Sequence, residues 1–147
     1  MVSPLGNTHL LIVGDYYGDS QEGPTIIMFL KSLEAAFYLK NLFSTIASSG
    51  ERMQLPREPR VRIRGIGSLY LSRRSSGREI ELHKIPSTVP VSFDWSATES
   101  GWRHQEDLMA PFCEGKIGHQ YLTPGNINDD AEIEVSFGEH HWPPLDI

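Results

Sequence analysis

The 147-residue sequence has only one cysteine, Cys113. A single thiol cannot build a disulfide framework or a thiolate zinc site, so we expect neither. The sequence also lacks an uncharged apolar run long enough for a membrane span, because three charged side chains interrupt the best stretch, residues 26–47. No basic segment followed by an apolar run marks a signal peptide at the start. Together these absences predict a cytoplasmic protein without membrane contact.

Spacings typical of catalytic or metal-binding motifs are also missing. Zinc sites on a helix need two histidines on one face, and sites on a strand need alternating histidines. Gly65 and Gly67 open no helix and are followed by no lysine, as a phosphate-binding loop would require. We therefore favour a protein without catalytic residues, metal site or cofactor. The six histidines, none of them at such a spacing, are His9, His83, His104, His119, His140 and His141.

The net charge of −6 is distributed unevenly along the chain. Residues 51–84 contain nine basic and four acidic side chains, whereas residues 85–147 contain two basic and eleven acidic ones. The acidic section predicts a surface for a basic protein partner, unless the two sections face each other inside the fold and cancel. Nucleic acid is not the expected partner, because the acidic section would repel its backbone. The alternative is that nucleic acid does bind, through a face on which the arginines of residues 51–84 contact phosphates and Tyr70 stacks on a base.

The longest helical pattern covers Pro24 to Ser48. Pro24 suits the first position of a helix, and Gly50 suits a left-handed cap after its end. The pattern is apolar most of the way round, which is typical of a helix buried on two sides. Leu33 and Phe37 lie on one of these sides, so truncation of either to alanine is expected to cost about 2–5 kcal/mol.

The other apolar side of this helix bears on the oligomeric state. It carries Leu39, Leu42 and Ile46. If a second helix covers them, the protein is a monomer; otherwise they pack against another copy. Because an exposed apolar patch of this size is unusual in a monomer, we expect a homodimer through the long helix.

Alternation of apolar and polar residues predicts strands in the middle of the chain. It extends over residues 60–71 and again over residues 78–85. A hairpin between them would pair Leu71 with Ile80, the register that keeps both apolar sets on one face. Gly77 would supply the positive φ that such a loop needs.

The remaining pattern completes a single α+β domain over residues 1–147. A capping box, Ser96-Ala-Thr-Glu99, predicts a second, shorter helix from near Ala97 to Pro111. We expect one antiparallel or mixed sheet of about five to six strands, with the long helix on one face. Further strands are predicted at residues 9–13, 89–95, 117–122 and 131–137.

The segment from residue 118 to 139 resembles the C-terminal part of small bacterial proteins of the toxin-immunity kind. The residues that carry the resemblance are Gly118-His-Gln-Tyr-Leu122, a polar loop with Asp129-Asp130, and Glu132-Ile-Glu-Val-Ser-Phe-Gly-Glu139. This resemblance implies a non-catalytic immunity or inhibitor protein, which neutralises a toxin by stoichiometric binding to its active surface. The acidic section, residues 85–147, fits a basic toxin.

The partner-binding residues that we predict are Asp129, Asp130, Glu132, Glu134 and Glu139, together with His119 and Tyr121. Glu132 and Glu134 alternate with an apolar set, so they face away from the core. A competing interpretation pairs these two glutamates within the sheet to arginines 60, 62 or 64. Two other functions remain open: a small enzyme with a polar site near His119, Tyr121 and Asp129, or a structural subunit of an oligomer.

Overall fold

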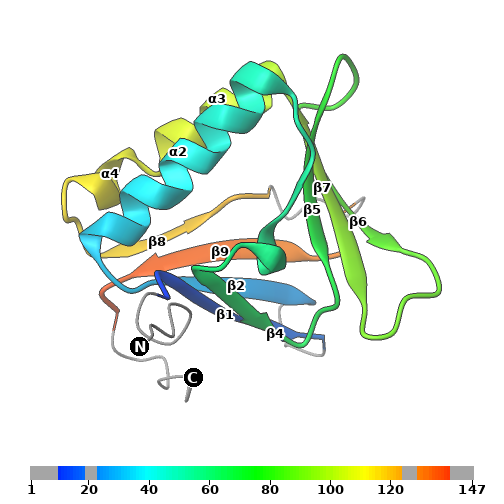
Figure 1. The fold of residues 1–147 in the computed structure, drawn as a ribbon, viewed down its shortest axis with the longest axis horizontal. Helices are drawn as coiled ribbons and strands as arrows, with labels where there is room; N and C mark the ends of the chain where they lie inside the picture. The colour runs from blue at the N-terminus through cyan, green and yellow to red at the C-terminus, as the bar shows by residue number, and fades with distance from the viewer. Residues whose placement is uncertain (1–9, 19–22, 124–128, 140–147) are drawn as a thin grey trace, which may run out of the picture.

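The computed structural model describes residues 10–18, 23–123 and 129–139. The fold is α+β, as predicted, but it contains two sheets where the sequence pattern predicted one. We call the five-stranded sheet sheet A and the four-stranded one sheet B (Figure 1). None of the helices in the described part of the chain combines the length and apolar character needed to span a bilayer.

Sheet A has the strand order 4-1-2-9-8, and sheet B has the order 3-5-7-6. The strands of sheet A are β1 (Ile12–Tyr17), β2 (Thr25–Leu30), β4 (Val61–Arg64), β8 (Gly118–Tyr121) and β9 (Glu132–Phe137). The strands of sheet B are β3 (Met53–Gln54), β5 (Leu69–Arg74), β6 (Ile80–Ile85) and β7 (Ser92–Thr98). The helices are α2 (Leu33–Ser49), the 3₁₀ turn η1 (Leu55–Arg57), α3 (Glu99–Leu108) and α4 (Ala110–Cys113).

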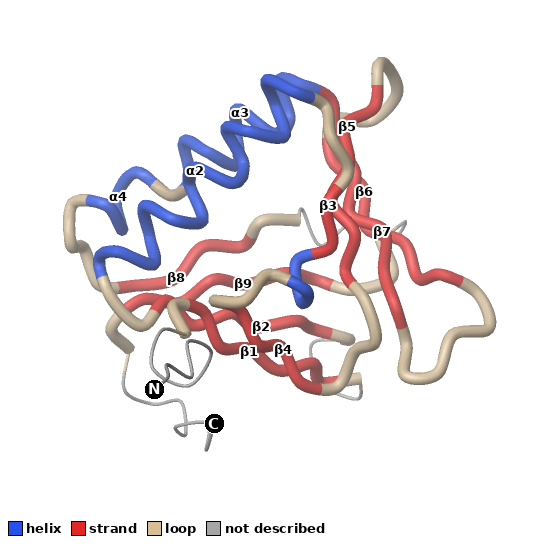
Figure 2. Tube along the Cα trace, viewed as in Figure 1, coloured by secondary structure: helices blue, strands red, loops and turns tan. Residues whose placement is uncertain are grey.

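The helices, sheet A and sheet B surround one core. The helices run along one side of the molecule, sheet A lies along the opposite side, and sheet B closes one end (Figure 2). Phe43 of α2, Trp95 of β7 and Trp102 of α3 pack together, with ring centroids 5.1–5.7 Å apart. Each aromatic ring buries a large apolar area, so this junction of helix and sheet is the centre of the core.

The predicted long helix is in fact a strand followed by a shorter helix. β2 takes up the first apolar residues, and α2 begins only after Ser32, whose hydroxyl accepts a hydrogen bond from Ala35 N at 3.2 Å. The run Thr25–Leu30 is apolar and rich in β-branched residues, which favours a buried strand over a helix. The end was predicted correctly: Gly50 has φ +73° and its N–H caps Ile46 O.

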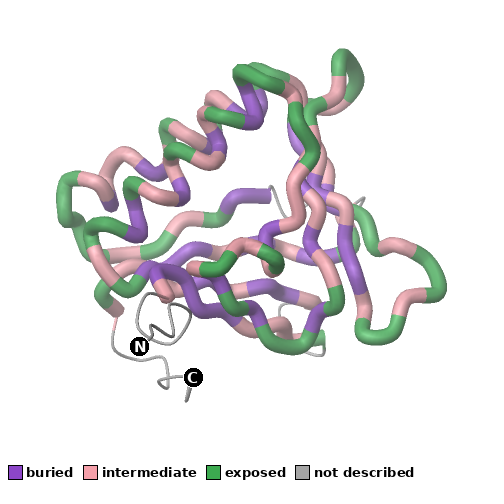
Figure 3. The backbone as a smooth tube through the Cα atoms, viewed as in Figure 1, coloured by how far each residue is buried: buried purple, intermediate pink, exposed green. Residues whose placement is uncertain are grey.

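This change of boundary alters which side chains the helix buries. Leu33 and Phe37 are 46% and 47% exposed, so the large loss expected on their truncation is wrong. The largest fully buried side chains of α2 include Leu39 and Phe43, and Figure 3 shows buried and exposed stretches alternating along the helix. The buried face of the helix was predicted wrongly because the helical period of 100° per residue was counted from residues that belong to β2, where successive side chains alternate instead.

The side of α2 on which the homodimer prediction rested is covered within the chain. α3 packs along α2, and Arg103 of α3 donates hydrogen bonds to Ser44 and Ser48 at 3.3 Å and 2.9 Å. Leu39 and Ile46 are buried under these contacts. The apolar surface that was to bind a second copy is therefore already occupied.

The predicted hairpin between β5 and β6 is wrong, although the faces of the strands are right. β7 lies between the two strands, parallel to β5 and antiparallel to β6. Leu71 and Leu82 are both opposite Trp95, and Ile80 is buried beside them. Gly77 does have a positive φ, +96°. Alternation is a local property, whereas pairing depends on which strand arrives from elsewhere in the chain.

The single alternating run over residues 60–71 is also divided between the two sheets. Val61 and Ile63 are buried in β4, after which the chain turns at Gly65, whose φ is +88°. β5 then begins at Leu69 in sheet B. A left-handed glycine thus interrupts the predicted alternating run, and the turn that it permits separates the two sheets.

The second helix begins two residues later than the capping box predicted. Thr98, and not Ser96, is the N-cap, and its hydroxyl accepts a hydrogen bond from Gly101 N at 3.1 Å. A Cβ on Gly101 would collide with the carbonyl oxygen of Glu79. Glycine therefore lets α3 approach the start of β6 closely.

Candidate functional site

Five of the seven predicted partner-binding residues lie on or beside one pair of strands in sheet A. In the antiparallel pairing of β8 with β9, His119 is opposite Ser136 and Tyr121 is opposite Glu134. Residues that are directly opposite share a face of the sheet. The alternate residues of β9, Ile133 among them, are buried in the core. His119, Tyr121 and Glu134 therefore share the outer face, and alternation places Glu132 there too.

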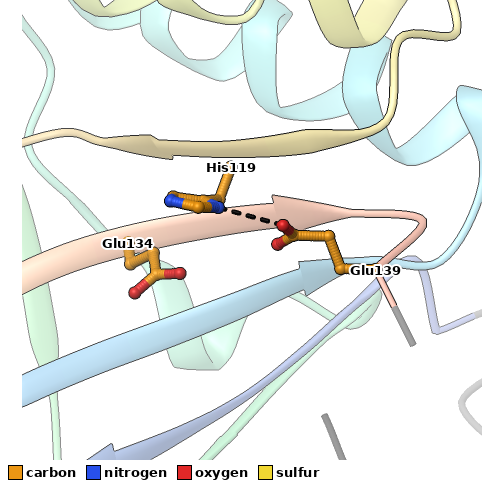
Figure 4. Close-up of side chains that lie close together, drawn as sticks. All are labelled: His119, Glu134 and Glu139. Atoms are coloured by element: carbon orange, nitrogen blue, oxygen red, sulfur yellow. Dashed lines mark hydrogen bonds and ion pairs between the residues drawn. The ribbon is translucent and has the colours of Figure 1, made fainter. Parts of the chain in front are cut away.

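Glu139 joins this face from beyond the end of β9. Its Oε2 lies 3.0 Å from Nδ1 of His119, and its Oε1 accepts a hydrogen bond from Ser136 Oγ at 2.6 Å. The rings of His119 and Tyr121 meet edge to face, with centroids 5.4 Å apart. Figure 4 shows His119 reaching across β9 towards Glu139, with Glu134 beside them. We call His119, Glu134 and Glu139 the His119 cluster.

The chain returns to the sheet at this point because of Gly138. Its φ is +73°, a left-handed conformation that residues with a Cβ rarely adopt. A Cβ there would also lie 2.8 Å from Cγ1 of Ile117. Ser136 is 2% exposed, and its hydroxyl donates a hydrogen bond to the returning Glu139. The sequence signal for this arrangement was a serine and a glutamate three residues apart with a glycine between them.

The two carboxylates of the cluster act on the imidazole. The hydrogen bond to Glu139 is the main cause that raises the pKa of His119 above its ordinary value of 6.5. The charges of Glu139 and Glu134 act in the same direction, while partial burial opposes them. The His119 side chain is 42% exposed, so solvent screens these interactions.

Asp129 and Asp130 make their contacts with the other sheet. Oδ1 of Asp129 accepts a hydrogen bond from Leu82 N at 3.1 Å, and Arg78 lies at 3.5 Å. Oδ2 of Asp130 accepts one from Lys84 N at 2.8 Å, and Asp130 N donates to Leu82 O at 3.0 Å. Both aspartates thus pair with the backbone of β6, an edge strand of sheet B. The Asp129 side chain is only 1% exposed, so it is not available to a partner.

The oppositely charged sections of the sequence partly cancel within the fold. β4, which carries the arginines of the competing interpretation, is separated from β9 by β1 and β2. The arginines of residues 51–84 instead have other acidic partners at 2.8–3.8 Å. These ion pairs are Arg52–Asp94, Arg60–Glu34, Arg64–Asp15, Arg74–Glu81 and Arg78–Asp129.

The His119 cluster places two carboxylates beside one imidazole. Glu139 stands between Ser136 and His119, so the serine hydroxyl contacts the carboxylate and not the imidazole that would activate it. At Cys113, burial raises the pKa of the thiol, which disfavours the reactive thiolate. The alternative enzyme site was predicted at His119, Tyr121 and Asp129. The rings of His119 and Tyr121 are in contact, but Asp129 accepts a hydrogen bond from β6 and lies apart from them.

Comparison with known protein families, curated proteins and solved structures finds no match to this chain.

Proposed function

We propose that the protein is a non-catalytic binding module that neutralises a basic protein partner by stoichiometric contact with the outer face of β8 and β9. The observation that supports this function is the gathering of His119, Tyr121, Glu134 and Glu139 on the outer face of β8 and β9. An aromatic ring next to carboxylates offers both apolar contact and charge, a combination enriched where proteins bind each other.

The charge distribution supports a basic partner. Residues 85–147 contain eleven acidic and two basic side chains, and five arginines of residues 51–84 are used in ion pairs within the fold. Three of these arginines pair with Asp15, Glu34 and Glu81, which lie outside residues 85–147, so the acidic section keeps a net negative charge. Complementary charge accelerates association and suppresses wrong partners. By the resemblance of residues 118–139, the partner is toxin-like and the module covers its active surface.

Charge reversal on the outer face tests the proposal. We expect Glu132→Lys/Glu134→Lys to slow association with the captured partner markedly and to leave the melting temperature unchanged. Glu99→Lys/Asp107→Lys is the matched control, because it makes the same change in net charge at two exposed positions of α3. The test first captures a basic protein from the native cytosol with the unmodified chain, and then measures association rates of all three forms.

Two results would contradict the proposal. Equal association rates of the Glu132→Lys/Glu134→Lys and control variants would mean that only net charge matters. A lowered melting temperature with an unchanged association rate would mean that the two glutamates act inside the sheet. If the proposal is right, association of the unmodified pair also slows as salt is raised, because screening shortens the reach of exposed charges.

A further inference from the structure

We propose that His119, Glu134 and Glu139 form a binding site for one divalent transition-metal ion of the Zn²⁺ type. The inference goes beyond the protein-binding function: it uses three of the same side chains, but one chain supplies the whole site and no partner is needed. One possible ligand atom from each of the three side chains lies within 4.8 Å of the other two. In the described part of the chain, no other set of three histidine, cysteine, aspartate or glutamate side chains comes as close.

The spacing of the ligand atoms suits a small cation. Zinc is bound tetrahedrally by nitrogen and oxygen at about 2.0–2.2 Å, which puts neighbouring ligand atoms roughly 3.3 Å apart. His119 Nδ1 and Glu139 Oε2 are already 3.0 Å apart. Glu134 lies on β9, on the same face, and its nearest ligand atom is within 4.8 Å of the ligand atoms of the other two side chains.

The chemistry of the three ligands selects the class of metal. Two carboxylates carry the −2 charge that balances a divalent ion, and one imidazole adds a nitrogen ligand that favours zinc and its transition-metal neighbours. Ca²⁺ takes six to eight oxygen ligands and Mg²⁺ an octahedron of oxygens, which a set with one imidazole and two glutamates fits poorly. Three protein ligands leave the fourth position of a zinc ion to water.

Ser136 orients one ligand from behind. Its hydroxyl donates to Oε1 of Glu139 at 2.6 Å, which leaves Oε2 directed at the imidazole. Outer-shell hydrogen bonds of this kind hold a ligating carboxylate in place. Gly138 supplies the turn that brings Glu139 to this position.

Titration of the isolated protein with Zn²⁺, in competition with a chromophoric chelator, tests the site. We expect one ion per chain, and at least about tenfold weaker binding after His119→Ala or Glu134→Gln. Ser136→Ala should weaken binding by a smaller factor. Co²⁺ provides a second readout, because visible absorption of the bound ion reports a low-coordinate site. Thermal melts without metal show that each variant is folded.

His83→Ala is the matched control. His83 is also an exposed histidine with two carboxylates nearby, but Glu81 lies at Nε2 (3.0 Å) and Asp130 at Nδ1 (3.8 Å). Carboxylates at opposite nitrogens cannot converge with the imidazole on one ion, so this variant should bind Zn²⁺ as the unmodified protein does. A second control, His140→Ala/His141→Ala, changes two histidines outside the described residues and should also retain binding.

The inference is overturned if the unmodified protein shows no saturable Zn²⁺ binding, or if His119→Ala and Glu134→Gln bind as tightly as it does. Loss of binding in His140→Ala/His141→Ala with retention in His119→Ala would likewise assign the metal elsewhere. No partner is present in these titrations, so their failure would leave the proposed protein-binding function standing. Conversely, loss of partner association in the lysine variants says nothing about the metal.

Discussion

Two acidic pairs lie within one short segment of the chain and have opposite roles. Asp129 and Asp130 are hydrogen-bonded to the backbone of β6, whereas Glu134 and Glu139 remain at an open face beside His119. The same type of side chain is thus a structural clamp in one place and a candidate ligand in the other. The difference lies in the groups next to each pair. Backbone N–H groups at the edge of β6 donate to the aspartates, whereas side chains on the outer face of β9 surround the glutamates.

The aspartate pair also covers an exposed edge of sheet B. β6 is an edge strand, and an uncovered edge invites pairing with other chains. Two carboxylates and one backbone N–H of residues 129–130 form hydrogen bonds with part of this edge. Two residues after Asp130, Glu132 N donates a hydrogen bond to Pro24 O, and β9 begins in sheet A. The segment therefore connects the two sheets by hydrogen bonds as well as by the chain itself.

The largest difference between the pairs should appear in stability. We expect Asp129→Ala to lower the free energy of unfolding by about 2–3 kcal/mol, because it leaves a buried N–H of Leu82 and the charge of Arg78 without their acceptor. Asp130→Ala, at an exposed carboxylate, should cost about 1 kcal/mol or less. Urea denaturation measures the free energy of unfolding of both variants. Equal losses would mean that the burial of Asp129 does not make its hydrogen bonds more important than those of the exposed Asp130.

Amide exchange should resolve the clamp one hydrogen bond at a time. In Asp130→Ala, the Lys84 amide loses its acceptor and should exchange about tenfold faster. The Leu82 amide, which bonds to Asp129, should be unaffected and serves as the internal control. Acceleration of both amides by the same factor would mean that the edge opens as a unit.

The isosteric change Asp129→Asn should separate charge from hydrogen bonding. The amide oxygen can still accept from Leu82 N, and the 3.5 Å contact with Arg78 is long, so we expect a loss of only about 1 kcal/mol. A loss as large as that of Asp129→Ala would make the ion pair with Arg78 the main contribution. Both variants are compared in the same urea series.

The smallest effect on folding is expected at the open face. His119→Ala and Glu134→Gln should each change the free energy of unfolding by less than about 0.5 kcal/mol, because exposed ion pairs contribute little. Thermal and urea unfolding check this in the absence of metal. A loss comparable to that of Asp129→Ala would show that the His119 cluster holds the fold together, which would weaken both proposals.

How far the sequence predicts the fold depends on whether a feature is local. Alternation correctly assigned the buried faces of β4, β5, β6 and β9, because period-two patterns are properties of a single strand. It could not reveal that β7 enters between β5 and β6, since the inward residues of any strand would satisfy the same pattern. The turn at Gly65 was visible only as a glycine within an otherwise regular run.

The candidate site follows the same division. The outward direction of Glu132 and Glu134 was predictable from their alternation with Ile133. His119 and Tyr121 were predicted as partner-binding residues from the sequence alone. The convergence of Glu139 on His119 was not predictable, because it depends on the β8–β9 register and on the turn at Gly138. The burial of Asp129 was missed because it depends on β6, which belongs to the other sheet.

The position of β9 has a consequence for synthesis on the ribosome. β9 is the last described strand in the sequence, yet it lies between β2 and β8 within sheet A. Until residue 137 has left the exit tunnel, β2 has no neighbour on that side and its apolar residues cannot complete the core. The nascent chain must therefore wait in an unfinished state, exposed to chaperones and to misassembly, until the strand that bears Glu134 arrives.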